Sequence, residues 1–406
     1  MPRRFPRAIL FFTVLLDMAG FGMILPLLPF YAQRFGADAF EVGVLFAGYS
    51  LAQAVFAPLV GRLSDRFGRR PVLLVTIAGS VAAHLLFAAA RSFPLLLVAR
   101  LASGAAAANF SIAQAYVADV TPPRERARGL GLVGAALGMG FVVGPAMGGL
   151  LSLASQVAVP LGAAALSLAN LALVAARLPE SLPRESRREP ARHSWLPLAS
   201  LFAQKRVVVA TLALHFAVLF AFATMEATLA LYCEHRFSFG VVETSILLVA
   251  MGLVIAGVQG GLIGRLVTHF GERRLVWVGI ALMSVGLFAL PLAPRVLLLG
   301  LATAVLAVGN GIHQPSLLGL VSQMSAEGTQ GEVLGLARSM GAYARATGPL
   351  WGGWLFVYRP AWPFWSASAL MALALLFALW LLRRPSFAAL QHAGAPSPAA
   401  VPRASG

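Results

Sequence analysis

The chain has 406 residues, 59% of them hydrophobic and 11% charged, and Lys and Arg outnumber Asp and Glu by 31 to 15. Soluble domains carry about 25% charged residues, so this composition, with a mean hydropathy of +0.81, excludes a soluble protein and indicates one built into a membrane. The excess of basic residues does not indicate a nucleic-acid surface, because these residues fall in short loops between apolar runs.

The cysteine and histidine content excludes further classes of protein. Cys233 is the only cysteine, so the chain has no intrachain disulfide, and no Cys or His cluster has the spacing of zinc ligands. We therefore expect neither a metal nor another cofactor. The sequence also has no nucleophile elbow and no phosphate-binding loop, which argues against a membrane-embedded enzyme or signalling protein.

The first apolar run follows the basic residues of MPRRFPR and continues for about 20 residues without a small-residue cleavage site. We therefore predict a retained membrane span and not a removed signal peptide. Further runs have the length that a helix needs to cross a bilayer. The twelve predicted spans are 7–30, 40–60, 71–90, 93–118, 129–153, 157–177, 207–233, 241–264, 275–294, 296–321, 334–357 and 362–382.

The loops between these spans divide sharply by charge. The loops on the side of the two termini hold 24 Arg and Lys residues, the loops on the other side hold 5, and Arg100 and Arg345 lie inside spans. Because basic loops stay in the cytoplasm, we predict a multi-pass protein of the cell membrane with both termini cytoplasmic.

The longest loop follows the sixth span and reads LPESLPRESRREPARHSWLPLASLFAQKR, which is polar, basic and proline-rich. It predicts an N-terminal half of six helices at 1–177, a cytoplasmic linker at 178–206 and a C-terminal half of six helices at 207–382. We expect the remaining residues, 383–406, to form a disordered cytoplasmic tail.

Two stretches of the first half recur in the second at nearly the same spacing. GRLSDRFGRR at 61–70 matches GRLVTHFGER at 264–273, and GPAMGG at 144–149 matches GPLWGG at 348–353. These matches predict a duplicated six-helix unit. Secondary transporters use such an arrangement to rock one half against the other around a central site.

Four stretches are similar to a known family of transporters. They are LLDMAGFGMILPLLPFYAQRFGA in span one, GRLSDRFGRRPVLL after span two, ARLASGAAAANFSIAQAYVADV in span four and GMGFVVGPAMGG in span five. With them the chain, over about 7–385, resembles the major facilitator superfamily, and within it the drug/proton antiporter branch that includes the tetracycline efflux proteins. The resemblance implies an all-α membrane protein of twelve transmembrane helices in two pseudo-symmetric six-helix halves, with a small-molecule substrate and protons as the coupling ion.

The stretch GRLSDRFGRR joins spans two and three. We expect Gly61 and Gly68 to allow a tight turn, and Asp65 to approach a helix N-terminus, where the helix dipole favours an acid. In the resembling family this loop braces the two halves on the cytoplasmic side and releases when the protein opens inward. The resemblance therefore implies a gate of Gly61, Asp65, Arg66, Gly68 and Arg69; a plain basic loop would explain the arginines alone.

Span five carries small residues, most of them at four-residue spacing on one face: Gly140, Gly144, Pro145, Gly148 and Gly149. Small residues let another helix approach closely, and proline removes a backbone hydrogen bond and bends the helix. The partner that we expect is span eight, which has glycines at positions 252, 257, 260, 261 and 264. In the resembling family this pattern marks exporters that exchange substrate for protons, so the resemblance implies antiport; ordinary helix packing is the alternative.

Four ionisable residues lie well inside the spans, namely Asp17, Arg100, Glu226 and Arg345. Each costs about 2.5–3.5 kcal/mol at a helix centre, so each should face the protein interior and have a partner. Burial favours the neutral form of a carboxyl, and we hypothesise that Asp17 or Glu226 carries the coupling proton in competition with substrate. A permanent ion pair with one of the two arginines is the alternative for either acid.

Arg100 falls on the arginine of the family's span-four motif, which is associated with proton transfer. We expect it to tune a nearby acid, because arginine itself does not lose its proton. Arg345 is the corresponding candidate in the second half.

Neutral polar residues within the spans are candidates for lining the substrate cavity. Asn310, His313 and Gln314 stand at i, i+3 and i+4 and so share one helix face. Hydrogen bonding to neighbouring helices is the alternative role. The full set is Gln53, Asn109, Gln114, Gln259, Asn310, His313 and Gln314.

The resemblance to the tetracycline efflux proteins is incomplete. Those proteins carry an acid in span three at the position of Ala83, a histidine in span eight at the position of Ile255, and an acid in span nine, where this chain has none; it keeps Asp17 and Gln259. The missing residues serve a charged metal–drug complex, which argues against tetracycline. Aromatic residues suit a large apolar or cationic drug, or ordinary packing: Phe21, Tyr49, Phe110, Phe220, Phe222 and Tyr343.

The main prediction is therefore proton-coupled efflux of drugs or other amphipathic small molecules by alternating access. The same fold also serves facilitators of polar metabolites such as sugars, amino acids or organic ions, and these need a cavity with more hydrogen-bonding groups and fewer aromatics. We expect the protein to function as a monomer in membrane lipid and to have no nucleic-acid partner.

Overall fold

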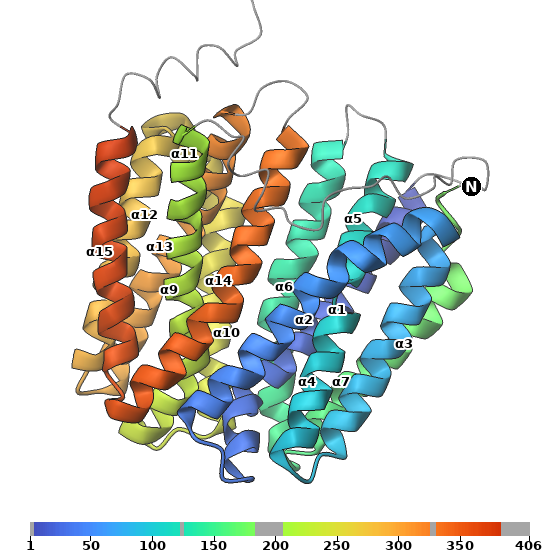
Figure 1. Ribbon diagram of the computed structural model, residues 1–406, viewed down its shortest axis with the longest axis horizontal. Coiled ribbons are helices and arrows are strands. Elements are labelled where there is room, and N and C mark those ends of the chain that lie inside the picture. Colours follow the sequence, from blue (N-terminus) through green and yellow to red (C-terminus); the bar gives the residue numbers. More distant parts are fainter. Residues whose placement is uncertain (1–3, 122–125, 183–205, 325–329, 383–406) are drawn as a thin grey trace, which may run out of the picture.

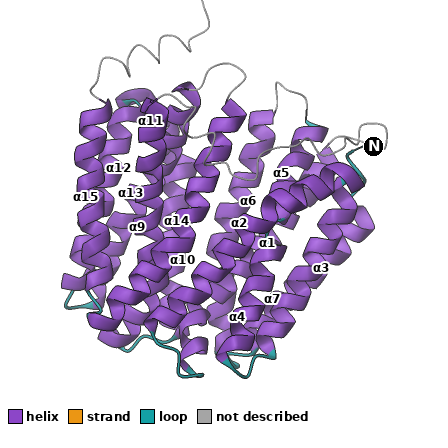
Figure 2. Ribbon diagram, viewed as in Figure 1, coloured by secondary structure: helices purple, strands orange, loops and turns teal. Residues whose placement is uncertain are grey.

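The computed structural model describes residues 4–121, 126–182, 206–324 and 330–382, and these hold helices and no strand (Figure 2). The first group of helices is α1 (Arg4–Gln33), α2 (Ala39–Phe67), α3 (Arg69–Ala88), α4 (Phe93–Ala106), α5 (Asn109–Val120), α6 (Arg126–Ser152) and α7 (Ala158–Arg177). The second group is α9 (Arg206–Phe237), α10 (Val241–Gly257), η3 (Val258–Leu262), α11 (Ile263–Phe270), α12 (Glu272–Ala289), η4 (Leu290–Leu292), α13 (Val296–Met324), α14 (Gln330–Tyr358) and α15 (Trp362–Leu382).

The helices confirm the expected all-α membrane fold. Within the described residues, eleven helical segments are long and apolar enough to span a membrane. The remaining expected span, 334–357, is α14, which is less apolar because it carries Arg338, Arg345 and several glycines. Since α14 packs against α2 and α9, much of its surface faces protein, where polar groups cost less than against lipid.

Two of the predicted spans are interrupted. Span four is divided into α4 and α5 at Ala107 and Ala108, and span eight passes from α10 through a π-helical turn, η3, into α11. Neither interruption contains a proline, the residue that would have predicted a break. π-Helical turns such as η3 occur often at functional sites in helices.

The ends of the helices define two faces of the molecule. The linker face holds Arg4, the turn at Gly68, Arg177 and Leu382, and it lies at the top of Figure 1. The opposite face holds the turns at 34–38, 153–157 and 359–361. The described parts of the first and last helices thus begin and end on the same face. Most of the predicted linker (183–205) and the predicted tail (383–406) lie outside the described residues.

The small residues of span five pack differently from our expectation. The face formed by Gly140, Gly144 and Gly148 lies against α1 and not against span eight: a Cβ added at Gly144 would be 2.6 Å from the Ala19 carbonyl oxygen. At Gly148 it would be 2.7 Å from the Met23 carbonyl oxygen. Helix α6 runs through Pro145 without a break.

Span eight contacts α6 only near the opposite face. Gly149 lies against Ser245 of α10, and a Cβ added at Gly252 would be 2.9 Å from Val142 Cγ2. At the other glycines of the predicted partner face, positions 257, 260, 261 and 264, an added Cβ would have no neighbour within 4 Å. The two helices therefore separate toward the linker face.

Other contacts between the two groups of helices also lie toward the opposite face. Gly353 of α14 packs on the backbone of Ala39, and Gly43 of α2 packs on Pro349. The Gln33 Nε2 atom donates a hydrogen bond of 2.7 Å to Glu234 Oε2, which joins the ends of α1 and α9. In Figure 1 the two groups of helices accordingly meet in the lower part of the view.

Candidate functional site

Asp17 lies in α1 among the helices of the first group. Its Oδ1 atom accepts a hydrogen bond of 2.9 Å from Asn109 Nδ2. Asn109 is 3% exposed and is the first residue of α5, directly after the break in span four. The break thus places a neutral amide, and not a cation, beside the carboxylate of Asp17.

Gln53 supports the same break from α2. Its Nε2 atom donates a long hydrogen bond, 3.4 Å, to the carbonyl oxygen of Ala107, a residue in the gap between α4 and α5. A backbone carbonyl freed from a helix in a membrane needs such a partner. In this structure Gln53, predicted as a cavity residue, has a supporting contact.

Arg100 is buried in α4, 3% exposed, and its guanidinium carbon lies 4.5 Å from the ring centroid of Tyr49. This is a cation–π contact. The Tyr49 ring in turn lies 4.9 Å from the ring of Phe21. Asp17, Tyr49 and Arg100 line one cavity of about 20 Å³, which is large enough for a water molecule. The full lining is Asp17, Phe21, Ile24, Tyr49, Ser80, His84, Arg100, Ser103 and Ala107.

The structure brings Asp17 and Arg100 to one cavity but does not pair them. Among the described residues, ion pairs within 4.0 Å are those of Arg69 with Asp65 and Asp119. Arg100 Nε is buried without a hydrogen-bond partner. The alternative of a permanent ion pair between Asp17 and Arg100 is therefore not the arrangement found.

The second group of helices holds a corresponding charged cluster. Glu226 of α9 lies within electrostatic range of Arg345 of α14, although the two do not form an ion pair within 4.0 Å. A Cβ added at Gly341 would lie 3.7 Å from Arg345 Nη1 and 3.8 Å from His215 Nε2, so these two side chains are neighbours. Arg345 is also within electrostatic range of Tyr49 of α2, in the other group of helices.

The remaining candidates for the cavity fall into two kinds of environment. Asn310 and His313 are buried in α13, and His313 packs against α12, with its Cβ 2.7 Å from a Cβ added at Gly279. Gln114 and Gln314 are partly buried, and Gln259 is exposed within η3. The shared helix face predicted for Asn310, His313 and Gln314 therefore packs in part against a neighbouring helix.

The predicted gate centres on Arg69, the first residue of α3. Its Nη1 atom lies 2.6 Å from Asp65 Oδ1 and donates to Ser64 Oγ at 2.6 Å, and its Nε atom donates to Asp119 Oδ2 at 3.1 Å. Ser181 Oγ also donates to Asp119, at 3.0 Å. We call these five residues the Arg69 cluster. All of them come from the first group of helices and the start of the linker.

Glu180, which sequence reasoning missed, joins this cluster to the linker. Its carboxylate accepts hydrogen bonds from the backbone N–H groups of Arg69 at 2.8 Å and Arg70 at 3.2 Å, at the N-terminus of α3. It also accepts from the backbone of Ser181 and Leu182, at 3.0 and 3.1 Å. The only available signal was an acid near the start of the predicted linker, directly after span six.

The structure corrects three details of the predicted turn. Helix α2 continues to Phe67, so Gly61 is helical, and a Cβ there would meet nothing within 4 Å. The turn rests on Gly68 alone, with a φ of +106°, a conformation that favours glycine. Asp65 lies in the last turn of α2, and Glu180 occupies the helix N-terminus that we expected Asp65 to approach. The Arg66 guanidinium lies over the ring of Phe67, at 5.3 Å.

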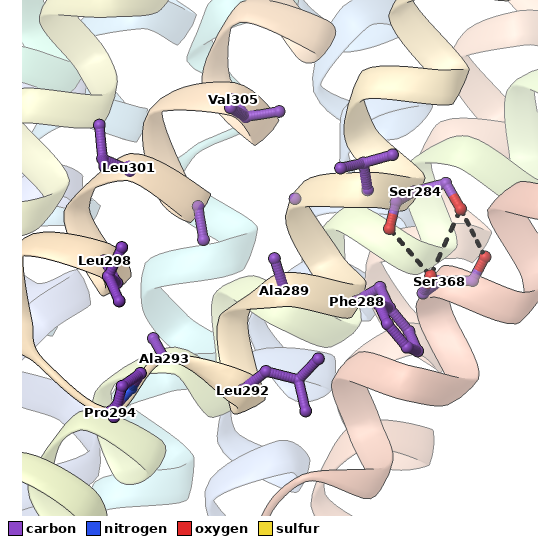
Figure 3. Close-up of a pocket in the computed structure, with 13 residues that line it drawn as sticks. Ser284, Phe288, Ala289, Leu292, Ala293, Pro294, Leu298, Leu301, Val305 and Ser368 are labelled. Atoms are coloured by element: carbon purple, nitrogen blue, oxygen red, sulfur yellow. Dashed lines mark hydrogen bonds between the residues drawn. The ribbon is translucent and has the colours of Figure 1, made fainter.

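A larger cavity, about 630 Å³, lies away from these residues, between α12, α13 and α15 (Figure 3). Apolar side chains such as Leu292, Leu298 and Leu301 line it and are more than 40% exposed. The Ser284 and Ser368 hydroxyls in its wall bond to each other's backbone carbonyls. With no charged residue in its lining, this cavity does not resemble a proton-coupling site.

Comparison with known proteins agrees with this architecture. The model of the Major Facilitator Superfamily matches residues 10–349 and 260–404. The tetracycline resistance protein, class C, of Escherichia coli is 32% identical over 343 residues, which cover 83% of this chain and 86% of that protein.

Solved structures agree as well. The crystal structure of the human organic anion transporter MFSD10 (TETRAN) has a TM-score of 0.72 at 27% identity and covers 93% of this chain and 100% of that chain. A bacterial homologue of the human lysosomal transporter Spinster has a TM-score of 0.75 at 14% identity, covering 98% and 100%, and so shares the fold. The chain belongs to the Major Facilitator Superfamily and is a membrane transporter, not an enzyme.

Proposed function

We propose that this transporter exports drugs or other amphipathic small molecules in exchange for protons, with Asp17 as the proton-binding group. The observation that carries the proposal is the Asp17 environment, a carboxylate within the membrane-spanning region that is hydrogen-bonded to the neutral Asn109 and not ion-paired to Arg100. A carboxyl in such a place can gain and lose a proton at moderate cost, which a permanent ion pair would prevent.

Two further features support export by alternating access. The relatives named as tetracycline resistance proteins are about 30% identical over most of their length. The adjacent rings of Phe21 and Tyr49 next to Asp17 suit an amphipathic substrate with a cationic group, which would compete with the proton. Glu226 beside Arg345 is the second candidate for a coupling acid.

We also propose that the linker face is cytoplasmic, because the loops of that side carry 24 of the Arg and Lys residues against 5 on the other. With the glycine contacts between the halves on the opposite face, the molecule then corresponds to a state open toward the cytoplasm. The gate formed by the Arg69 cluster, in this state, is held within one half. The proposed location is the cell membrane, and the proposed unit is the monomer.

The proposal is tested with Asp17→Asn and Glu226→Gln in vesicles that carry a pH gradient, with the lipophilic cation tetraphenylphosphonium as the probe. We expect loss of pH-driven transport in at least one variant. Glu234→Gln is the matched control, because glutamine keeps an oxygen that accepts from Gln33 at the opposite face. Unchanged pH-driven transport in both acid variants would exclude proton coupling through these residues.

A second candidate function is facilitated transport of an organic anion. Arg100 favours it, because its buried Nε lacks a partner and no carboxylate lies within 4.0 Å, and the structure of MFSD10 is described as that of an organic anion transporter. The effect of pH on substrate binding separates the two candidates. Protons compete with a cation for Asp17, whereas protonation of Asp17 favours an anion near Arg100.

A further inference from the structure

Asp17 and Arg100 are opposite charges inside the membrane-spanning region that do not form an ion pair. They line the same cavity of about 20 Å³. An isolated charge is costly in a membrane, so two opposite charges around one small cavity are expected to form an ion pair. They do not lie within 4.0 Å of each other. Some other group must therefore hold the guanidinium in its place.

Tyr49 is that group. Its ring centroid lies 4.5 Å from the guanidinium carbon of Arg100, and the ring of Phe21 packs against it at a centroid distance of 4.9 Å. Tyr49 is 7% exposed. Gly104 of α4, four residues after Arg100, packs directly on the Tyr49 backbone, with no room for a side chain. The backbone contact of α2 with α4 thus fixes the ring relative to Arg100.

We propose that Tyr49 is a positioning residue that holds Arg100 away from Asp17 and so leaves Asp17 free to exchange its proton. The proposal rests on the proposed role of Asp17 in proton coupling. The contact that holds Arg100 is made by the aromatic ring of Tyr49 and not by its hydroxyl, because a cation–π interaction requires only the ring face.

Few other charged groups surround Asp17. His84 of α3 lines the same cavity, and Arg345 of α14 interacts with Tyr49 from the other half, with His215 and Glu226 of α9 beside it. Residues 131–152 of α6 and 158–176 of α7 contain no Asp, Glu, Lys, Arg or His, and α10 has only Glu243, in its first turn. The charged residues of α2 and α5 lie near the ends of these helices: Glu41, Arg62, Asp65, Arg66 and Asp119. Arg100 is therefore the cation whose position matters most for the charge of Asp17.

The test follows protonation of Asp17 directly, by infrared difference spectroscopy of the full chain in lipid bilayers as the pH is changed. The C=O stretching band of a protonated carboxyl that disappears in Asp17→Asn reports on Asp17. We compare Tyr49→Phe, which keeps the ring, with Tyr49→Leu and Tyr49→Met, which remove it. We expect Tyr49→Phe to keep the titration midpoint of the wild type within about 0.3 pH unit, and the other two to lower it by about one unit, a tenfold loss in proton affinity.

The titration midpoint of Asp17 should fall, and not rise, when the ring is removed. Without the ring, Arg100 can approach Asp17, and a nearby positive charge favours the ionised carboxylate. In an Arg100→Gln background, Tyr49→Leu should then leave the midpoint where Arg100→Gln alone has it. Tyr49→Met preserves bulk if the leucine variant does not fold.

Three results would overturn the proposal: equal midpoints for Tyr49→Phe and both ring-free variants, a shift in Tyr49→Phe as large as in Tyr49→Leu, or a shift that persists in the Arg100→Gln background. The measurement is independent of any substrate. If Asp17 titrates as described but the vesicles show no proton coupling, the proposed function fails and the role of Tyr49 stands. If coupling is lost in Asp17→Asn while the ring-free variants resemble the wild type, only the role of Tyr49 fails.

Discussion

The two repeated motifs differ in how similar the contacts of their two copies are. Near the opposite face, the copies GPAMGG and GPLWGG make equivalent contacts: Gly144 packs on α1, Gly348 packs on α9, and Gly149 and Gly353 each pack on a helix of the other half. Near the linker face, the copies GRLSDRFGRR and GRLVTHFGER share a glycine turn, at Gly68 and Gly271, and little else.

The difference lies in the charged groups. The first copy has the Arg69 cluster and Glu180, whereas in the second copy Thr268 stands in place of Asp65 and donates only to the carbonyl oxygen of Arg265 within its own helix. Backbone packing is thus kept in both halves and the polar contacts in one. We infer that close helix contact is a requirement of each half, and that the charged turn has a role specific to the first.

Alanine at the central glycines should have the largest effect and should affect both halves alike. In Gly144→Ala the new methyl carbon would lie 2.6 Å from the Ala19 carbonyl oxygen, and in Gly348→Ala 2.7 Å from that of Phe220. We expect each to lower stability by about 3 kcal/mol, because backbone cannot move aside as a side chain can. Thermal unfolding in detergent measures this, with Gly138→Ala as the control, since its Cβ meets nothing within 4 Å. A loss in one half only would contradict the equivalence.

Removal of Arg69 should lower the stability more than removal of a polar contact from the second copy of the turn. Arg69→Ala leaves the partly buried Asp119, with 23% of its side chain exposed, without its cationic donor, and we expect a loss of about 2 kcal/mol. The comparison variant in the second copy is Thr268→Ala, at the position that aligns with Asp65, the ion-pair partner of Arg69; it removes an exposed hydroxyl contact and should cost less than about 0.5 kcal/mol. Unfolding temperatures of the two variants give the comparison; equal values would mean that the charged turn adds nothing to the first half.

The glycines between the halves should differ slightly in effect. A methyl group at Gly353 meets the backbone of Ala39, whereas at Gly149 it meets the Ser245 side chain, which can move. We expect Gly353→Ala to favour opening of the opposite face by about 1.5 kcal/mol, and Gly149→Ala by less. Spin labels at Arg34 and His235, both exposed on that face, report the opening as a longer distance. A larger opening in Gly149→Ala would reverse the order.

The smallest expected effect concerns the acids at the start of α3 and α12. Glu180→Gln loses the charge that accepts from four backbone N–H groups, and we expect a cost of about 1 kcal/mol. Glu272→Gln changes the acid at the first residue of α12, the position that aligns with Arg69, and should cost less than about 0.5 kcal/mol, because the buried Oε2 atom of Glu272 has no hydrogen-bond partner. The unfolding temperatures would disagree with this view if the second variant were the more sensitive.

Several features of the site were open to sequence reasoning. Asp17, Arg100, Glu226 and Arg345 stand out because charge within an apolar span is rare and costly. The contacts of these four residues could not be predicted from the sequence. The pairing of Asp17 with Asn109 depends on the break between α4 and α5, and the contact of Arg100 with Tyr49 depends on the register between α2 and α4. Both are set by packing between segments far apart in the chain.

The partner of span five shows the same limit. The small residues predicted a close helix contact, and the contact exists, but α1 provides it and span eight contributes only near its end. A glycine face specifies how near another helix can come, not which helix comes.

The sequence by itself determined that the chain is a membrane protein, where its helical spans lie, that two motifs are repeated and to which family it belongs, since apolar length, charge between spans and local repeats are properties of the chain alone. Tertiary structure decided which acid has a cation beside it, which glycine meets which helix and on which face the halves touch. These contacts join residues that are distant in sequence, and their distances are set only when the helices pack together.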